Sequence, residues 1–231
     1  MQLLIAANRA AAYTAAARWV VHDLRSPAQS LTLLADLMAD PDTDIEEILR
    51  ESCRHLGRSL DLLSRVLHPA PPGERGPISV REPLELIRDL HHAGRTRARL
   101  EVTVDASVPA AAGIERHLEH ALLNLVLNAN TALQHSDGGL IRIGARDNGE
   151  QVEIVVADNG PGLAPDLAGS LFQRALTGAS GTRLSGAGLP VASEVLRISG
   201  GTLTYAPDTG PGARFVITLP RWRRAVTPRD Q

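Results

Sequence analysis

A histidine near the start of the chain is the first residue whose surroundings suggest chemistry. His22 stands in the sequence Val-His-Asp-Leu-Arg-Ser-Pro, and a neutral imidazole nitrogen can act as a nucleophile. Asp23 can accept a hydrogen bond from one ring nitrogen, which fixes the tautomer and leaves the other nitrogen free. Ser26, one helical turn later, could orient a water molecule, and Pro27 should bend the helix because it donates no backbone hydrogen bond. On its own, the histidine is also explained as an ordinary surface residue.

Two asparagines four residues apart form the second motif. Asn124 and Asn128 enclose the sequence Leu-Val-Leu, so a helix would place both amides on one face and the leucines on the others. An amide oxygen is a hard, neutral ligand that suits Mg²⁺. The alternative, a pair of asparagines that cap or bridge loops, stays open from this motif alone.

Glycine-rich turns supply the third and fourth motifs. Asp158 ends the apolar run Val-Val-Ala-Asp, just before a turn that contains Gly160 and Gly162. A carboxylate held there could bind the exocyclic amine of adenine, which guanine lacks at that position, although the segment could equally be a simple turn. Gly186 and Gly188 precede a predicted helix, whose free N–H groups and dipole favour a phosphate. This last pattern is weak evidence when taken alone.

The N-terminal elements that would position His22 are helical. Within residues 1–67 a first helix is predicted to end at Asp40-Pro41-Asp42, and the capping-box spacing of Thr43 and Glu46 predicts the start of a second. We expect a helical hairpin, which would cover its remaining apolar stripe by forming a dimeric four-helix bundle with a second copy. The heptad seam of the first helix comprises Leu3, Ala7, Ala10, Thr14, Ala17, Val21, Leu24, Ala28, Leu31, Ala35 and Met38.

The C-terminal region has a mixed pattern, so the predicted fold class is α+β. Residues 68–77 are rich in proline and glycine and are predicted to be a linker to a domain at 78–220. The glycine-rich segment 160–188 is too long for an ordinary turn and predicts a functional loop or lid, and residues 221–231 are predicted to be a basic, solvated tail. Helices are expected near 81–95, 114–133 and 188–199, and strands near 99–105, 139–146, 151–157, 201–205 and 212–219.

Composition excludes several classes of protein. The 231 residues are 43% apolar, which rules out a wholly disordered chain, and the net charge of −2 gives no electrostatic case for nucleic acid as a partner. Cys53 is the single cysteine, which excludes an internal disulfide and favours a cytoplasmic location. No run approaches the roughly 20 apolar residues of a membrane span.

The order of the four motifs resembles the core of two-component sensor histidine kinases. In that family a dimerisation and histidine-phosphotransfer hairpin precedes an ATPase domain of the gyrase and heat-shock-chaperone type, a Bergerat-type α/β sandwich. The resemblance covers about residues 1–67 for the hairpin and 78–220 for the ATPase domain. It implies a cytoplasmic homodimer that acts as an ATP-dependent protein-histidine kinase.

The resemblance assigns roles to the residues around the histidine. His22 would be the phosphoacceptor that attacks the γ-phosphate of ATP, and Asp23 would orient it and accept its proton. Ser26 would position a water molecule for response-regulator phosphatase activity. The phosphoryl group would pass to an aspartate on a response-regulator receiver domain. Because His22 lies close to Met1, the signal is expected from a separate sensor protein, unless the chain is a fragment.

The resemblance also assigns the nucleotide-binding residues. Asn128 would bind Mg²⁺, Asn124 would line the phosphate side, and Asp158 would bind the adenine amine. The remaining residues that it implies are Gly160 and Gly162 for close backbone approach, Phe172 at the start of the lid, Arg174 as a cationic contact, and Gly186 and Gly188 around the phosphates.

Three positions depart from the family pattern and keep other functions open. Thr131 replaces a basic residue, Ala132 replaces an aromatic one, and Pro190 replaces a glycine in the second glycine motif. A phosphotransfer adaptor with a degenerate, non-ATP-binding domain is therefore the alternative. A serine kinase that restrains a sigma factor ranks last, because it would not need the motif around His22.

Overall fold

A five-stranded sheet in the order β2-β4-β5-β7-β6 forms the centre of the fold. β2 is parallel to β4, and the other neighbouring pairs are antiparallel. The strands are β2 (Arg99–Val104), β4 (Leu140–Asn148), β5 (Gln151–Asp158), β6 (Thr202–Tyr205) and β7 (Arg214–Pro220). The computed structural model describes residues 1–23, 53–54, 56–57, 60, 73–94, 96–163, 171–172, 188–207 and 210–223.

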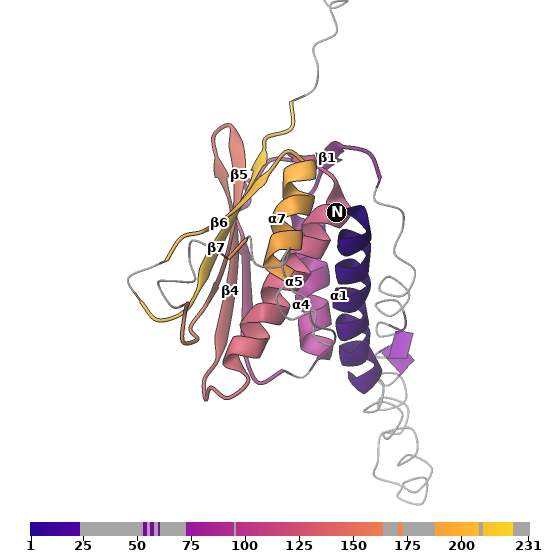
Figure 1. Ribbon diagram of the computed structural model, residues 1–231, viewed down its shortest axis with the longest axis vertical. Helices are drawn as coiled ribbons and strands as arrows, with labels where there is room; N and C mark the ends of the chain where they lie inside the picture. The colour runs from indigo at the N-terminus through magenta and orange to yellow at the C-terminus, as the bar shows by residue number, and fades with distance from the viewer. Residues whose placement is uncertain are drawn as a thin grey trace, which may run out of the picture.

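Three helices cover one face of this sheet (Figure 1). They are α4 (Arg81–Ala93), α5 (Glu115–Leu133) and α7 (Gly188–Ile198). A small second sheet pairs β1 (Gly76–Ile78) with β3 (Ala111–Gly113) in antiparallel register. The result is a two-layer α/β sandwich, with its helices on one side and the solvent-facing side of the sheet on the other.

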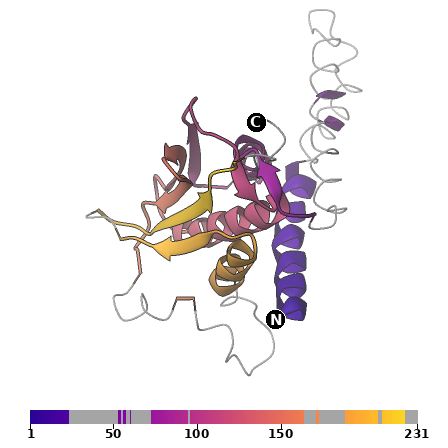
Figure 2. The same ribbon diagram turned by 90° about the horizontal axis from the view of Figure 1, so that it is seen from above.

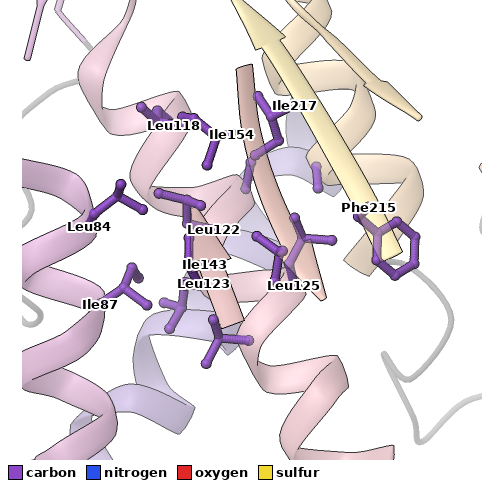
Figure 3. Packing of buried hydrophobic residues seen from close by; sticks show 14 of the residues in the cluster. Leu84, Ile87, Leu118, Leu122, Leu123, Leu125, Ile143, Ile154, Phe215 and Ile217 are labelled. Carbon is purple, nitrogen blue, oxygen red and sulfur yellow. The ribbon is translucent and has the colours of Figure 1, made fainter. Parts of the chain in front are cut away.

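The core lies between the helices and the sheet. Alternate residues of the central strands are buried, such as Ile141 and Ile143 on β4 and Ile154 on β5, because successive side chains of a strand point to opposite faces. Leucines of α5 pack onto them, as Figure 3 shows for Leu122 and Leu125. Burying each such side chain contributes about 1.5–3 kcal/mol, so this contact holds the sandwich together.

The mixed α and β pattern expected beyond residue 78 is confirmed, with three helices and five strands in the predicted places. The structure adds β1 and β3, which the sequence did not reveal. β1 begins at Gly76, inside the segment expected to be a linker, and it pairs with Gly113, which is far away in the sequence. Three-residue strands, here Gly-Pro-Ile and Ala-Ala-Gly, are too short to carry a periodic signal, so only the long-range pairing defines them.

The N-terminal helix α1 (Gln2–Asp23) packs on the outer side of the helical layer, away from the sheet. It contacts α4, α5 and α7, and Figure 2 shows it as a third layer seen from above. Among its described side chains, the buried ones are Asn8, Ala12, Tyr13, Ala16 and Ala17. The helix predicted for this segment is therefore present over residues 2–23, but most of its buried face had not been anticipated.

The predicted heptad seam lies largely on the exposed side of α1. Leu3 is 87% exposed and Val21 is 52% exposed, and of the seam residues up to Val21 only Ala17 is buried. Most of the seam is thus solvent-exposed over this length. The remaining seam positions, the turn at 40–42, the capping box and most of the second helix lie outside the described residues, so the hairpin and the bundle stay predictions.

Candidate functional site

A row of side chains along α5 forms the base of the site. Asn124, Asn128 and Ala132 are spaced four residues apart and share one face of the helix, as expected for its 3.6-residue turn. Asn124 is buried, and its Nδ2 donates a hydrogen bond to the carbonyl of His120 at 2.9 Å, which leaves its Oδ1 directed elsewhere. Asn128 is exposed, so a metal ion can reach its side chain from solvent.

The turn after β5 meets the far end of this row. A Cβ added to Gly160 would lie 3.5 Å from the Cβ of Ala132 and 3.4 Å from a Leu133 methyl group, so the turn packs directly against α5. Gly160 donates its N–H to Oδ1 of Asp158 at 2.9 Å. The predicted carboxylate and the predicted asparagine motif are therefore brought to the same place by the packing of β5 on α5.

The start of α7 lies beside the other end of the row, at Asn124 and Asn128. A Cβ on Gly188 would lie 3.1 Å from Oδ1 of Asn124 and 3.7 Å from Nδ2 of Asn128. The free N–H groups of the first turn of a helix attract anions, and here they lie beside the two asparagines. The second, third and fourth sequence motifs thus converge on one site.

A loop that the sequence analysis did not single out holds Asp158 in place. Asp158 donates its N–H to the carbonyl of Ala213 at 2.9 Å, and Ala213 donates its own N–H to Oδ1 of Asp158 at 3.3 Å. Gly212 adopts φ +112°, and a Cβ on it would overlap the carbonyl oxygen of Asp158. The carbonyl of Gly212 also lies 2.9 Å from the position of a Cβ on Gly162. The signal for this loop was present in the sequence as Gly-Pro-Gly before a strand.

The arrangement leaves one carboxylate oxygen of Asp158 available. Its Oδ1 accepts from Gly160 and Ala213, whereas no donor from the described part of the chain reaches its Oδ2. Asn159, which follows Asp158, is structural, because its side chain bonds the backbone of Leu140 and Gly138. A half-buried carboxylate with one oxygen fixed and the other free suits the binding of a single amine.

The other predicted site residues are placed only in part. Phe172 is half-buried and packs against the hydrophobic core, which is where a residue at the start of a lid can be anchored. His22 and Asp23 lie at the C-terminal end of α1, but their side chains are not among the described ones. Ser26, Arg174 and Gly186 lie outside the described residues.

The three residues that depart from the family pattern each fit their local surroundings without breaking a helix. Thr131 donates its hydroxyl to the carbonyl of Leu127 at 2.8 Å, so it brings no positive charge to the site. Ala132 is the small residue against which the turn at Gly160 packs. Pro190 is the third residue of α7, where a missing N–H breaks no hydrogen bond within the helix.

Comparison with a known family now decides what kind of domain this is. Residues 113–223 match the histidine kinase-, DNA gyrase B- and HSP90-like ATPase family. These residues form an ATPase domain of that family. The match spans α5, the turn after Asp158, α7 and the loop at Gly212, which are the elements that build the site of the ATPase domain.

Curated relatives extend the similarity along the chain. The sensory histidine kinase/phosphatase NtrB of Vibrio alginolyticus is 28% identical over 88% of this chain and 61% of its own length. The C4-dicarboxylate transport sensor protein DctB of Rhizobium meliloti (strain 1021) is 31% identical over 94% of this chain and 36% of its own length. The resemblance to two-component sensor histidine kinases is therefore confirmed, although the chain spans less than two thirds of the length of either relative.

Solved structures share the fold. The catalytic domain of histidine kinase ThkA is 20% identical and superimposes with a TM-score of 0.55 over 64% of this chain and 97% of its own. The Acinetobacter baumannii histidine kinase AdeS is 20% identical, with a TM-score of 0.52 over 87% of this chain and 98% of its own.

The site of the ATPase domain fits a nucleotide with Mg²⁺. The described residues contain no cluster of three or more histidine, cysteine, aspartate or glutamate side chains that could hold a metal by themselves. Mg²⁺ in nucleotide sites usually takes only one or two protein ligands and completes its shell with phosphates and water. The amide of Asn128, which is exposed beside the start of α7, has the chemistry that such a ligand needs.

None of the helices in the described part of the chain is both long and apolar enough to span a lipid bilayer.

Proposed function

We propose that this chain is an ATP-dependent protein-histidine kinase of a two-component system, with His22 as the phosphoacceptor. The observation that carries the proposal is the convergence of Asn124, Asn128, Asp158 and Gly188 on one side of α5. That convergence joins a carboxylate for adenine, an amide for Mg²⁺ and a helix N-terminus for phosphates. Similarity to NtrB and DctB across most of the chain supports it.

The residues would share the work of phosphoryl transfer in the following way. Asp158 would bind the adenine amine through Oδ2, because Oδ1 is already held by two backbone N–H groups. Asn124, Gly186, Gly188 and the cationic Arg174 would surround the phosphates. Asn128 would hold Mg²⁺, which when bound neutralises negative charge on the phosphate oxygens.

The chemical step would occur at the histidine. A ring nitrogen of His22 would form a bond to the γ-phosphorus as the bond from that phosphorus to the bridging oxygen of ADP breaks, and Asp23 would accept the ring proton. An aspartate of a response-regulator receiver would then take the phosphoryl group. Phosphatase activity, which the name of NtrB includes, would use Ser26 to position the attacking water.

Homodimerisation through the exposed seam of α1 belongs to the same proposal. Leu3 and Val21 are exposed apolar residues at the two ends of the described part of the seam, and a second copy would cover them. Light scattering at micromolar concentration should give the mass of a dimer. A stable monomer would contradict the bundle.

The phosphoacceptor is tested by label transfer from γ-labelled ATP. The variant His22→Gln should lose all acid-labile label, because phosphohistidine is hydrolysed in acid and glutamine cannot form it. His92→Gln is the matched control, since His92 is an exposed histidine on α4 away from the site, and it should keep the label. Label retained in His22→Gln would move the acceptor elsewhere.

Adenine recognition is tested by calorimetry with ATP and Mg²⁺. Asp158→Ala should abolish ATP binding, because no other described carboxylate lies at the adenine position. The control Asp105→Asn changes an exposed acid that also follows a strand, β2, and should bind normally. Unchanged affinity in Asp158→Ala would refute the role, and no binding by the wild-type chain would favour the adaptor.

A further inference from the structure

A second pocket lies on the face of the sheet that the helices do not cover. Its volume is about 410 Å³. Arg142 of β4 and Arg214 of β7 line two of its sides, Ala157 of β5 forms its floor, and the loop 210–213 lines a third side. The helices of the described part of the chain all lie on the opposite face of the sheet (Figure 1). We call this cavity the outer pocket.

The pairing of the strands places the three side chains together on this face. Ala157 pairs with Arg142 on one side and with Arg214 on the other. Phe215, which follows Arg214, is buried in the core, and successive side chains of a strand point to opposite faces. Ala157 and Asp158 therefore also point to opposite faces. The outer pocket lies directly behind the carboxylate that we propose for adenine binding.

The spacing of the two arginines suits one small ligand. Neighbouring strands lie about 4.7–4.9 Å apart, so the backbones of β4 and β7 are separated by about 9–10 Å with β5 between them. The methyl group of Ala157 is too small to fill the space between the two long side chains. A guanidinium group presents a planar fork of N–H donors, and two such groups above Ala157 can bind the oxygens of one phosphate group from both sides.

The charged side chains around the outer pocket leave it positive. Arg214 is half-buried, and no acceptor from the described part of the chain binds its guanidinium group. Arg142 approaches Glu101 through Nε at 3.4 Å, but Nη2 of Arg99 lies 3.1 Å from the other oxygen of that carboxylate. Three arginines thus accompany one glutamate, which leaves two positive charges. A half-buried cation without a counter-charge is unfavourable, and a dianion would supply that charge.

We propose that the outer pocket is a second binding site, which takes a phosphate-type dianion. Arg142 and Arg214 would each donate two hydrogen bonds to its oxygens, and Ala157 would leave room for the phosphorus between the strands. The two positive charges match the charge of about −1.5 to −2 that a phosphate monoester carries near pH 7. Inorganic phosphate has the same chemistry, so either source of the dianion fits the pocket.

The outer pocket and the nucleotide site share one loop. Gly212 and Ala213 line the outer pocket, and Ala213 donates its N–H to Oδ1 of Asp158 at 3.3 Å. A dianion bound to Arg214, the next residue, would restrain this loop and thereby hold Asp158 in place for adenine. Bound phosphate should therefore raise ATP affinity, and ATP should raise phosphate affinity by the same factor. This coupling rests on the proposed function, because it requires Asp158 to bind adenine.

Binding is tested by titrating the full chain with inorganic phosphate at constant ionic strength. Nuclear magnetic resonance should show saturable shifts of the amide signals of residues 142, 157 and 212–214. Phosphate affinity should fall at least tenfold in Arg214→Gln, which removes a ligand, and in Ala157→Leu, which fills the floor but keeps both charges. Arg88→Gln is the control, because it removes an equal charge from an exposed position on α4 and should bind as the wild type does.

Three outcomes of this titration decide the proposal. Shifts at these amides that do not saturate, or an unchanged phosphate affinity in Arg214→Gln, would overturn it. A parallel titration with phenyl phosphate distinguishes the two sources of the dianion. Tighter binding of phenyl phosphate would identify a phosphate monoester as the ligand, and weaker binding would identify inorganic phosphate.

The coupling is tested by calorimetry with ATP and Mg²⁺, with and without saturating phosphate. ATP affinity should rise about fivefold in the wild type and not at all in Arg214→Gln. An unchanged ATP affinity in the wild type would overturn the coupling, and a lower one would show that phosphate competes at the nucleotide site instead. Failure of the wild type to bind ATP would overturn the proposed function, whereas phosphate binding in the outer pocket would still be observed.

Discussion

The helical layer of the ATPase domain has two faces that are built in opposite ways. Toward the sheet, α4, α5 and α7 present leucine, isoleucine and valine, which pack against Ile143, Ile154 and Ile217 (Figure 3). Toward α1, the same layer presents Arg116, Glu119 and His120, which meet asparagine, tyrosine and alanine. The face toward the sheet is apolar throughout, whereas the face toward α1 combines buried polar contacts with the apolar contacts of Ala12, Ala16 and Ala17.

Removal of a side chain from the apolar face should have the largest effect on stability. Leu122→Ala should lower the free energy of unfolding by about 2–5 kcal/mol, because the leucine is fully buried and its loss leaves a cavity. Denaturant titration followed by circular dichroism measures the change. Leu3→Ala, on the exposed seam of α1, should change it by less than about 0.5 kcal/mol. A similar loss in both variants would show that α1 belongs to the same cooperative core.

A substitution in the loop at Gly212 should weaken ATP binding by displacing Asp158. Gly212→Ala should reduce ATP affinity at least tenfold, because the new Cβ would overlap the carbonyl of Asp158 in a backbone conformation that strains alanine. Gly210→Ala is a close control, since a Cβ on Gly210 meets nothing within 4 Å and its φ is not positive. Calorimetry with ATP measures both. Equal affinities would mean that the loop does not position Asp158.

Acid should lower the free energy of unfolding through His120, which is buried between α5 and α1. The pKa of His120 is about 4 in the folded chain, below the value of 6.5 expected for the unfolded one, chiefly because of burial. As pH falls below 6.5, His120 of the unfolded chain binds a proton, whereas His120 of the folded chain stays neutral until the pH nears 4. The stability present above pH 6.5 is therefore lost progressively between pH 6.5 and pH 4. The loss at pH 5 should be on the order of 1–2 kcal/mol.

The matched comparison is with His120→Gln, which keeps a donor for Asn8 but does not titrate. Its free energy of unfolding should fall less steeply between pH 6.5 and 4 than that of the wild type, measured by denaturant titration at each pH. The pKa values of His91 and His117 are also lowered by burial, so both proteins keep some of the dependence. If the free energy of unfolding fell equally with pH in both proteins, the pH dependence would arise from His91 and His117 instead.

Much of the ATPase domain was predictable because its signals are local. Alternating residues such as Ile141 and Ile143 define a strand with one buried face, and the spacing of Asn124 and Asn128 defines one face of a helix. The order of the motifs then indicated their family. The loop at Gly212 was missed because its role depends on a contact with Asp158, which lies more than fifty residues earlier in the sequence.

By itself, the sequence determined the α+β fold class, the helices and strands with clear periodicity, and the residue types available for nucleotide binding. Only the tertiary structure decided that the turn after Asp158 and the start of α7 both pack on the asparagine-bearing α5, and that Asn8 and Tyr13, with only Ala17 of the described seam, are buried against the ATPase domain. The physical reason is that periodicity records whether a side chain is buried or exposed, but not which distant element buries it. An alanine-rich helix such as α1 has several faces that can pack, and the polar groups available on α5 select one of them.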